Sequence, residues 1–220
     1  DISGSLGWGW RLTARDVHIT TNVLPTGQES LGIFNALHAG ARAYVTLPDG
    51  SHAGFTFQPE QVDLPGLTYY LPHWVADPGV SYELASVETL LIRAGSKFYD
   101  QASGQPYHPA SGFFTGADYT LTAPDGSYDL IDSRNGIVEH VAASGKHFQV
   151  STAGIVAENG EQLQFLFNAD GRLAKLVTAD HTVVEYAYDA LGNLTHVQNG
   201  SSEAVYGYDA NALHQLTAAI

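Results

Sequence analysis

The stretch "EYAYDALGNLTHVQNGSSEAVYGYDANALHQLT", residues 185–217, states one phrase twice: an aromatic run, then Tyr-Asp-Ala, then a short polar turn that closes on leucine. With the upstream phrase "FNADGRLAKL", the leading aromatic residue recurs after 21 residues (Phe167 to Tyr188) and again after 20 residues (Tyr188 to Tyr208). Such a period fits one β-hairpin per unit. Because a single hairpin is not stable alone in water, we expect the units to stack edge to edge into a continuing antiparallel sheet.

Each residue type in the phrase has a predicted structural task. The aromatic rings are expected to stack on their equivalents in the next unit, with the tyrosine hydroxyl left in water or hydrogen-bonded. The following aspartate accepts backbone N–H groups at the head of the turn, a glycine takes the left-handed conformation, and a leucine re-enters the sheet on its apolar face. The aromatic residues are Phe167, Tyr188 and Tyr208, the aspartates are Asp189 and Asp209, the glycines are Gly171 and Gly192, and the leucines are Leu173, Leu194 and Leu216. Asp170 is a further residue of the first repeat.

Other segments also indicate strands. Residues 44–57 and 119–132 both place Pro-Asp-Gly-Ser between alternating apolar arms, and this turn chemistry predicts two hairpins. Near the start, Trp8, Trp10 and Leu12 alternate with smaller or polar residues, as in a half-buried strand. The segment "SVETLLIRAG", residues 86–95, fits a short helix or a buried strand, and we favour the strand.

Composition excludes several classes of protein. The 220 residues are 44% hydrophobic, which is enough for a packed core of one unit or two small ones. A formal net charge of −14 argues against nucleic acid and anionic membranes as partners. There is no cysteine, and no apolar run approaches the roughly 20 residues of a membrane helix. No targeting segment is visible, and we expect the chain to be a piece of a longer protein.

The phrases "YAYDALGNLTHV", "YGYDANALHQLTAA" and "FNADGRLAKL" resemble the YD repeats of the Rhs/YD-repeat family. The resemblance covers about residues 119–220, and the early phrase "GSLGWGWRL" is similar to a Gly-aromatic phrase found where such β regions begin. The last unit departs from the pattern, with Ala212 in place of the turn glycine and His214 in place of an Arg or Asn.

This resemblance implies an all-β fold of antiparallel hairpin repeats. In complete members the hairpins spiral into a hollow shell, carried on large bacterial proteins that are secreted or displayed on the cell surface. About three units cannot close a shell, so we expect a curved sheet or sandwich. Residues 1–118 would be an N-terminal β-rich capping or lead-in region, and residues 119–220 the repeat array, unless the two form one continuous domain.

Candidate chemical sites are few. No hydrolase, P-loop or dinucleotide motif is present, and the ten histidines show no metal-ligand spacing. No catalytic residue or cofactor is predicted, although Asp125, Asp129 and Asp132 form an acidic cluster that raises a calcium hypothesis. Aromatic rings beside acidic residues can also form sugar platforms. The candidates for such a ligand site are Trp8, Trp10, Tyr69, Tyr70 and Trp74.

The sequence is therefore interpreted as a non-enzymatic structural segment, a scaffold or shell element, of a secreted or cell-surface bacterial YD-repeat protein. Its partners would be neighbouring segments of the parent chain. The first alternative is an adhesin module that binds a glycan or peptide, with a surface protein or glycan as partner. A polysaccharide lyase built around "YYLPH", residues 69–73, is the less favoured alternative.

Overall fold

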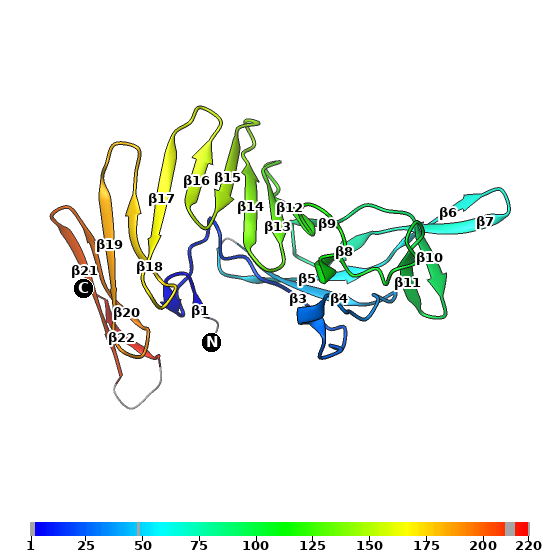
Figure 1. The fold of residues 1–220 in the computed structure, drawn as a ribbon, viewed down its shortest axis with the longest axis horizontal. Helices are drawn as coiled ribbons and strands as arrows, with labels where there is room; N and C mark the ends of the chain where they lie inside the picture. The colour runs from blue at the N-terminus through cyan, green and yellow to red at the C-terminus, as the bar shows by residue number, and fades with distance from the viewer. Residues whose placement is uncertain (1–2, 48, 210–213, 220) are drawn as a thin grey trace. The chain divides into compact units, whose positions relative to one another are not determined.

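The computed structural model describes residues 3–47, 49–209 and 214–219. The chain divides into two compact units: the first comprises Asp1–Asp16 and Lys146–Ile220, and the second comprises Val17–Gly145. Every described element is a β-strand apart from two single turns of 3-10 helix, so the predicted all-β antiparallel fold is confirmed (Figure 1). The predicted boundary after residue 118 lies inside the second unit, and the assignment of a capping region and an array stays a prediction.

The second unit holds three antiparallel groups of strands, in the orders β3-β4-β5-β8, β11-β10-β7-β6 and β9-β12-β13-β14. Its elements are β3 (Ile19–Thr21), η1 (Glu29–Leu31), β4 (Arg42–Thr46), β5 (His52–Phe57), β6 (Glu60–Leu64), β7 (Leu67–Leu71), β8 (Trp74–Ala76), β9 (Glu83–Ser86), β10 (Leu91–Ala94), β11 (Lys97–Asp100), η2 (Pro109–Ser111), β12 (Tyr119–Thr122), β13 (Tyr128–Asp132) and β14 (Gly136–Val141). Residues 91–94 of the ambiguous segment form β10, which confirms the strand interpretation there.

Aromatic side chains fill the core of the second unit. The ring of Phe57 lies 5.1 Å from that of Trp74, 5.8 Å from Phe98 and 6.0 Å from Tyr107, measured between centroids. All four side chains are buried. The Trp74 indole N–H donates to Ser86 Oγ at 2.8 Å, so the polar atom of this ring is satisfied inside the core.

Both Pro-Asp-Gly-Ser hairpins are confirmed. β4 pairs with β5 and β12 with β13, each through an antiparallel ladder. In each turn the aspartate Oδ1, of Asp49 or Asp125, accepts the backbone N–H of the serine two residues later. Gly50 and Gly126 have φ of 93° and 85°, a conformation that costs glycine little. Local turn chemistry thus sets the position and register of both hairpins.

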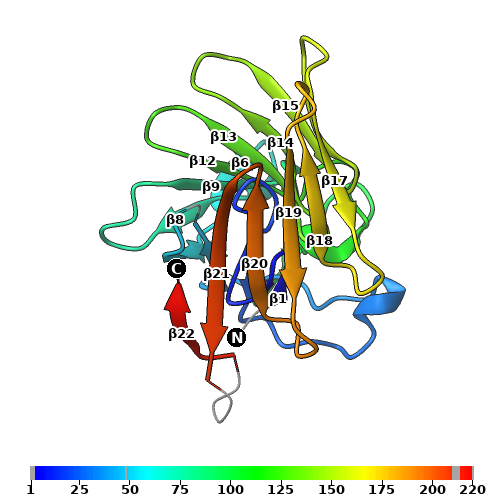
Figure 2. The same cartoon turned by 90° about the vertical axis from the view of Figure 1, so that its left-hand side faces the viewer.

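The first unit consists mainly of strands that follow one another in sequence order. Its elements are β1 (Ser3–Gly4), β2 (Gly7–Trp8), β15 (His147–Ser151), β16 (Gly154–Ala157), β17 (Gln162–Phe167), β18 (Leu173–Val177), β19 (Val183–Tyr188), β20 (Leu194–Asn199), β21 (Ser202–Tyr208) and β22 (Leu216–Ala219). Each strand from β15 to β22 pairs with the next, so the predicted edge-to-edge stacking of hairpins is confirmed (Figures 1 and 2).

The strand expected through Trp8, Trp10 and Leu12 is wrong for most of its length. Only Gly7–Trp8 is strand, paired with β1, and the next strand is Ile19–Thr21. Gly7 and Gly9 have φ of 87° and 72°, which turns the chain twice within three residues. The carbonyl of Leu12 then accepts the N–H groups of Arg15 and Asp16 in a turn. Glycines at every second position therefore mark bends here rather than a pleated strand.

Candidate functional site

Three hairpins carry the repeated phrase, and we call them the first (β17–β18), second (β19–β20) and third (β21–β22) repeat hairpins. In each one the aromatic residue pairs with the leucine that re-enters the sheet: Phe167 with Leu173, Tyr188 with Leu194, and Tyr208 with Leu216. A register shift immediately precedes every one of these aromatic residues. The same bulge recurs because the same turn chemistry follows it, and bulges re-aim the side chains beside them.

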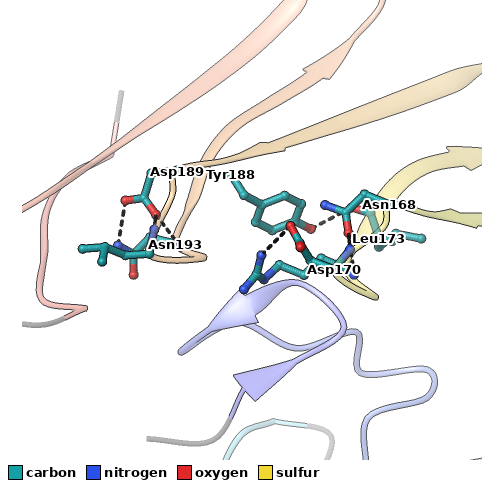
Figure 3. A network of polar contacts seen from close by, with 8 residues as sticks. Asn168, Asp170, Leu173, Tyr188, Asp189 and Asn193 are labelled. Atoms are coloured by element: carbon teal, nitrogen blue, oxygen red, sulfur yellow. Dashed lines mark hydrogen bonds and ion pairs between the residues drawn. The ribbon is translucent and has the colours of Figure 1, made fainter.

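The turn is organised by an Asn or Asp that directly follows the aromatic residue. Oδ1 of Asn168 accepts the N–H groups of Asp170 and Arg172 at 3.0 and 2.9 Å. Oδ1 of Asp189 likewise accepts the N–H groups of residues 191 and 193, both at 2.9 Å, and its Oδ2 accepts the side-chain amide of Asn193 at 2.8 Å (Figure 3). Burial acts to raise the pKa of Asp189, but these hydrogen bonds outweigh it and hold the pKa below its ordinary value.

Asn168 is the head of the first turn, as Asp189 is the head of the second. Asp170 lies two residues later in the same turn, and its carboxylate contacts the guanidinium of Arg172 at 3.3 Å. The predicted glycines are confirmed, because Gly171 and Gly192 have φ of 76° and 85°. Gly192 also leaves room for Arg172, whose guanidinium lies 2.3 Å from the point a Cβ would occupy.

The third repeat hairpin uses a different residue at the left-handed position. His214 has φ of 61° and stands two residues before Leu216, as Gly171 and Gly192 stand two residues before their leucines. The predicted glycine replacement, Ala212, lies outside the described residues. The side-chain amide of Asn193 donates to Asp189, so its oxygen is left to accept the Nδ1–H of His214 at 2.6 Å. His214 therefore ties the third turn to the second.

Tyrosine hydroxyls connect successive repeats. The hydroxyl of Tyr188 in the second hairpin donates to the carbonyl of Leu173 in the first, at 2.7 Å (Figure 3). The hydroxyl of Tyr208 in the third hairpin donates to the carbonyl of Leu194 in the second, at 2.8 Å. Burial raises the pKa of both tyrosines, as expected for hydroxyls drawn away from water. One type of bond thus recurs at each step of the array.

The predicted ring stacking between repeats is replaced by other contacts. Within the described ranges, no ring pair joins Phe167, Tyr188 and Tyr208. The guanidinium of Arg172 lies over the Tyr188 ring instead, 5.8 Å from its centroid. Leu173 and Leu194 are buried at 0% and 2% exposure, as expected. Leu216 has the same register position opposite Tyr208 but is 44% exposed on β22.

The five aromatic candidates for a ligand site belong to two different units. Trp8 and Trp10 lie in the first unit, where Trp8 stacks on His214 at 4.5 Å between centroids and the Trp10 indole N–H donates to the Tyr208 hydroxyl at 2.9 Å. The other three lie in the second unit: Trp74 is buried in the core, Tyr70 contacts Phe98 edge to face, and Tyr69 is half-buried on β7. Ligand binding by any of them stays a prediction.

The three aspartates of the calcium hypothesis each have local partners. Asp125 accepts hydrogen bonds from the backbone N–H and the hydroxyl of Ser127. Asp132, at the opposite end of β13, accepts hydrogen bonds from the backbone N–H groups of Arg134 and Asn135. Asp129 is buried, and its Oδ1 contacts Nδ1 of His140 at 2.7 Å. Among the residues described, no group of three or more His, Asp or Glu side chains could hold one metal ion. Calcium binding stays a prediction.

The described part of the chain contains no helix with the length and hydrophobicity needed to cross a membrane.

Comparison with known proteins agrees with the repeat pattern. Residues 167–204, from the end of β17 into β21, match the family model described as RHS Repeat. The predicted resemblance is therefore confirmed over that span. No curated protein matches the chain. Among solved structures, it is similar to one of the Photorhabdus luminescens Tc holotoxin pore, with 13% sequence identity and a TM-score of 0.30, over 80% of this chain and 11% of that chain.

Proposed function

We propose that this chain, whose residues 167–204 match the RHS Repeat model, is a non-enzymatic scaffold segment of a large YD-repeat protein. The observation that carries the proposal is the pair of hydroxyl-to-carbonyl bonds, Tyr188 to Leu173 and Tyr208 to Leu194. The tyrosine hydroxyls, the polar atoms most characteristic of the repeat, are engaged in hydrogen bonds that hold one hairpin to the next. They are therefore not free to act on a substrate.

The turns support the same proposal. The side-chain oxygens of Asn168 and Asp189 accept hydrogen bonds from the backbone of their own turns. The amide of Asn193 donates to Asp189, and its oxygen accepts from His214. A catalytic site needs polar groups that converge on a space a reactant can enter. In the repeat hairpins the described polar groups converge on one another.

The resemblance described above extends this proposal to the parent protein. Its partners would be neighbouring repeat segments, and the parent would be secreted or displayed on the bacterial surface. Adhesion to a glycan or a surface protein is the alternative use of the same segment. In that case the hairpin array would be the support, and the residues that bind the ligand would be other side chains displayed on it.

One panel of assays separates these functions. The purified chain is applied to a glycan array with and without calcium, and is also incubated with uronate polymers. The scaffold proposal expects no reproducible glycan binding and no new ultraviolet absorbance. Binding that is lost in Tyr69→Ala but kept in Tyr44→Ala, an exposed tyrosine outside the candidate set, would favour the adhesin. New absorbance from the polymers would establish a lyase.

A further inference from the structure

The segment Ser3–Asp16 lies against the turn ends of all three repeat hairpins, and we call it the clasp. Its contacts advance along the array in order. The carbonyl of Ser5 accepts the N–H of Leu173 in the first hairpin at 2.8 Å, and the N–H of Trp8 donates to the carbonyl of Gly192 in the second at 3.4 Å. In the third hairpin, Tyr208 accepts the indole N–H of Trp10 at 2.9 Å. Among the described residues, the clasp therefore has a polar contact with every one of the three repeats.

Ring contacts and close packing accompany these bonds. Trp8 stacks on His214 with 21° between the ring planes, and Trp10 lies 4.7 Å from the ring of Tyr206. Gly7 sits directly against the second hairpin: a Cβ on this residue would lie 2.4 Å from the Gly192 carbonyl oxygen. Only a residue without a side chain fits there, and its φ of 87° also favours glycine.

The clasp is also closed on itself. The carboxylate of Asp16 accepts the backbone N–H of Ser5 at 2.7 Å, the Ser5 hydroxyl at 2.6 Å, and the backbone N–H of Leu12 at 2.8 Å. These three bonds hold residues 5–12 in a bent loop. In the intact chain this bend reduces the conformational freedom that the clasp loses when it docks, whereas a peptide of residues 1–13 must find Asp16 as part of its binding surface.

We propose that the turn ends of the three repeat hairpins form a peptide-docking surface, selective for a Gly-Trp-Gly-Trp segment, and that the clasp is its built-in ligand. Neither the repeat motif nor the scaffold function requires such a surface. Trp10 and Tyr208 are 198 positions apart, so the contact closes only after the last repeat has formed. The docked clasp holds the three hairpins at a fixed spacing. Its full set of contacts can form only when all three hairpins are folded.

The experiment cuts the clasp after Thr13, so that residues 1–13 are detached while Asp16 and every residue of the binding surface stay with the chain. A site-specific protease sequence is inserted in the full chain between Thr13 and Ala14, both of which are exposed. After cleavage, residues 1–13 are held only by non-covalent contacts. The proposal predicts that this peptide stays with the chain on size-exclusion chromatography, and that a fluorescein-labelled synthetic peptide of residues 1–13 replaces it in a saturable manner.

Variants are placed in the synthetic peptide alone, so the folding of the chain is unaffected. Gly7→Ala should weaken binding at least 100-fold, because the methyl group meets the Gly192 carbonyl. Gly9→Ala is the matched control: Gly9 has a similar φ of 72°, but a Cβ there meets nothing within 4 Å, so we expect about a tenfold loss from backbone strain. Trp10→Phe keeps an aromatic ring but loses the indole N–H and part of the contact with Tyr206, and a loss of at least about fivefold is expected.

Three outcomes would overturn the proposal. The cleaved peptide could elute freely while the labelled peptide shows no saturable binding, or Gly7→Ala could bind as well as Gly9→Ala. If the chain loses its fold on cleavage, refolding must be restored by the wild-type peptide and not by the Gly7→Ala peptide; failure of this rescue also overturns the proposal. The tyrosine bonds between repeats are measured separately, so failure of the clasp would leave the scaffold function standing.

Discussion

Replacing Tyr188 or Tyr208 with phenylalanine removes a hydroxyl and keeps the ring. Tyr188→Phe takes the donor from the carbonyl of the buried Leu173, one hydrogen bond that contributes about 1 kcal/mol net. Tyr208→Phe leaves two groups without their partner, the carbonyl of Leu194 and the indole N–H of Trp10. We therefore expect about 2 kcal/mol for Tyr208→Phe, roughly twice the cost of Tyr188→Phe.

Hydrogen exchange followed by mass spectrometry measures these losses within the first unit alone. Losses of 1 and 2 kcal/mol correspond to exchange about 5-fold and 30-fold faster for the amides of β17–β21. Tyr186→Phe is the matched control, because Tyr186 lies on the same strand as Tyr188, is half-buried, and makes no described hydroxyl hydrogen bond. If Tyr188→Phe and Tyr208→Phe exchange no faster than Tyr186→Phe, the hydroxyl bonds do not hold the repeats together.

Three further predictions concern the turns and the core. Against the effect of burial, turn hydrogen bonds hold the pKa of Asp189 below its ordinary value, so its stabilisation is present above the unfolded-state pKa and is lost as pH falls through the folded-state pKa. Asp189→Asn should keep the turn and flatten acid unfolding followed by circular dichroism, whereas Asn168→Asp should steepen it. In urea unfolding, Gly171→Ala and Gly192→Ala should each cost about 1 kcal/mol from their positive φ, because at Gly192 the added methyl meets only the movable end of the Arg172 side chain; wild-type stability in both variants would refute the left-handed turns. Trp74→Phe should destabilise the second unit by about 2 kcal/mol in urea unfolding, because it removes a hydrogen bond and leaves a cavity. An unchanged free energy of unfolding would show that Trp74 does not pack in the core.

Local chemistry made much of this fold predictable. In the two Pro-Asp-Gly-Ser hairpins, every interaction that defines the turn lies within five residues, so sequence alone contains it. The repeat period of 20 to 21 residues similarly gave the register of Tyr188 and Tyr208, because each aromatic residue and its turn are adjacent in sequence. Asn168 was not among the predicted repeat residues, because it is an asparagine where the second repeat has Asp189. Matching the residue that follows the aromatic, Asn168 with Asp189, would have found the head of the first turn.

Contacts between distant parts of the sequence were not predictable in the same way. The bonds from Tyr188 and Tyr208 to leucine carbonyls cross from one hairpin to the previous one, and no residue pattern marks a backbone acceptor. The clasp depends on contacts that span almost the whole chain. One signal was present: Gly7 and Gly9 interrupt the tryptophan alternation, and glycine inside a strand pattern often indicates close backbone approach. For Gly7 the approach is to Gly192.

The most direct test of the scaffold is to observe the tyrosine hydroxyl protons that join its repeats. In a mixture of H2O and D2O, a hydroxyl that exchanges slowly gives two resolved ¹³Cζ signals in NMR, one for each isotope, whereas a free hydroxyl gives a single averaged signal. With ¹³Cζ-labelled tyrosine, and with assignments from Tyr188→Phe and Tyr208→Phe, both residues should give paired signals. A single averaged signal from each would mean that the hydroxyls are open to water and that the repeats are held by something else.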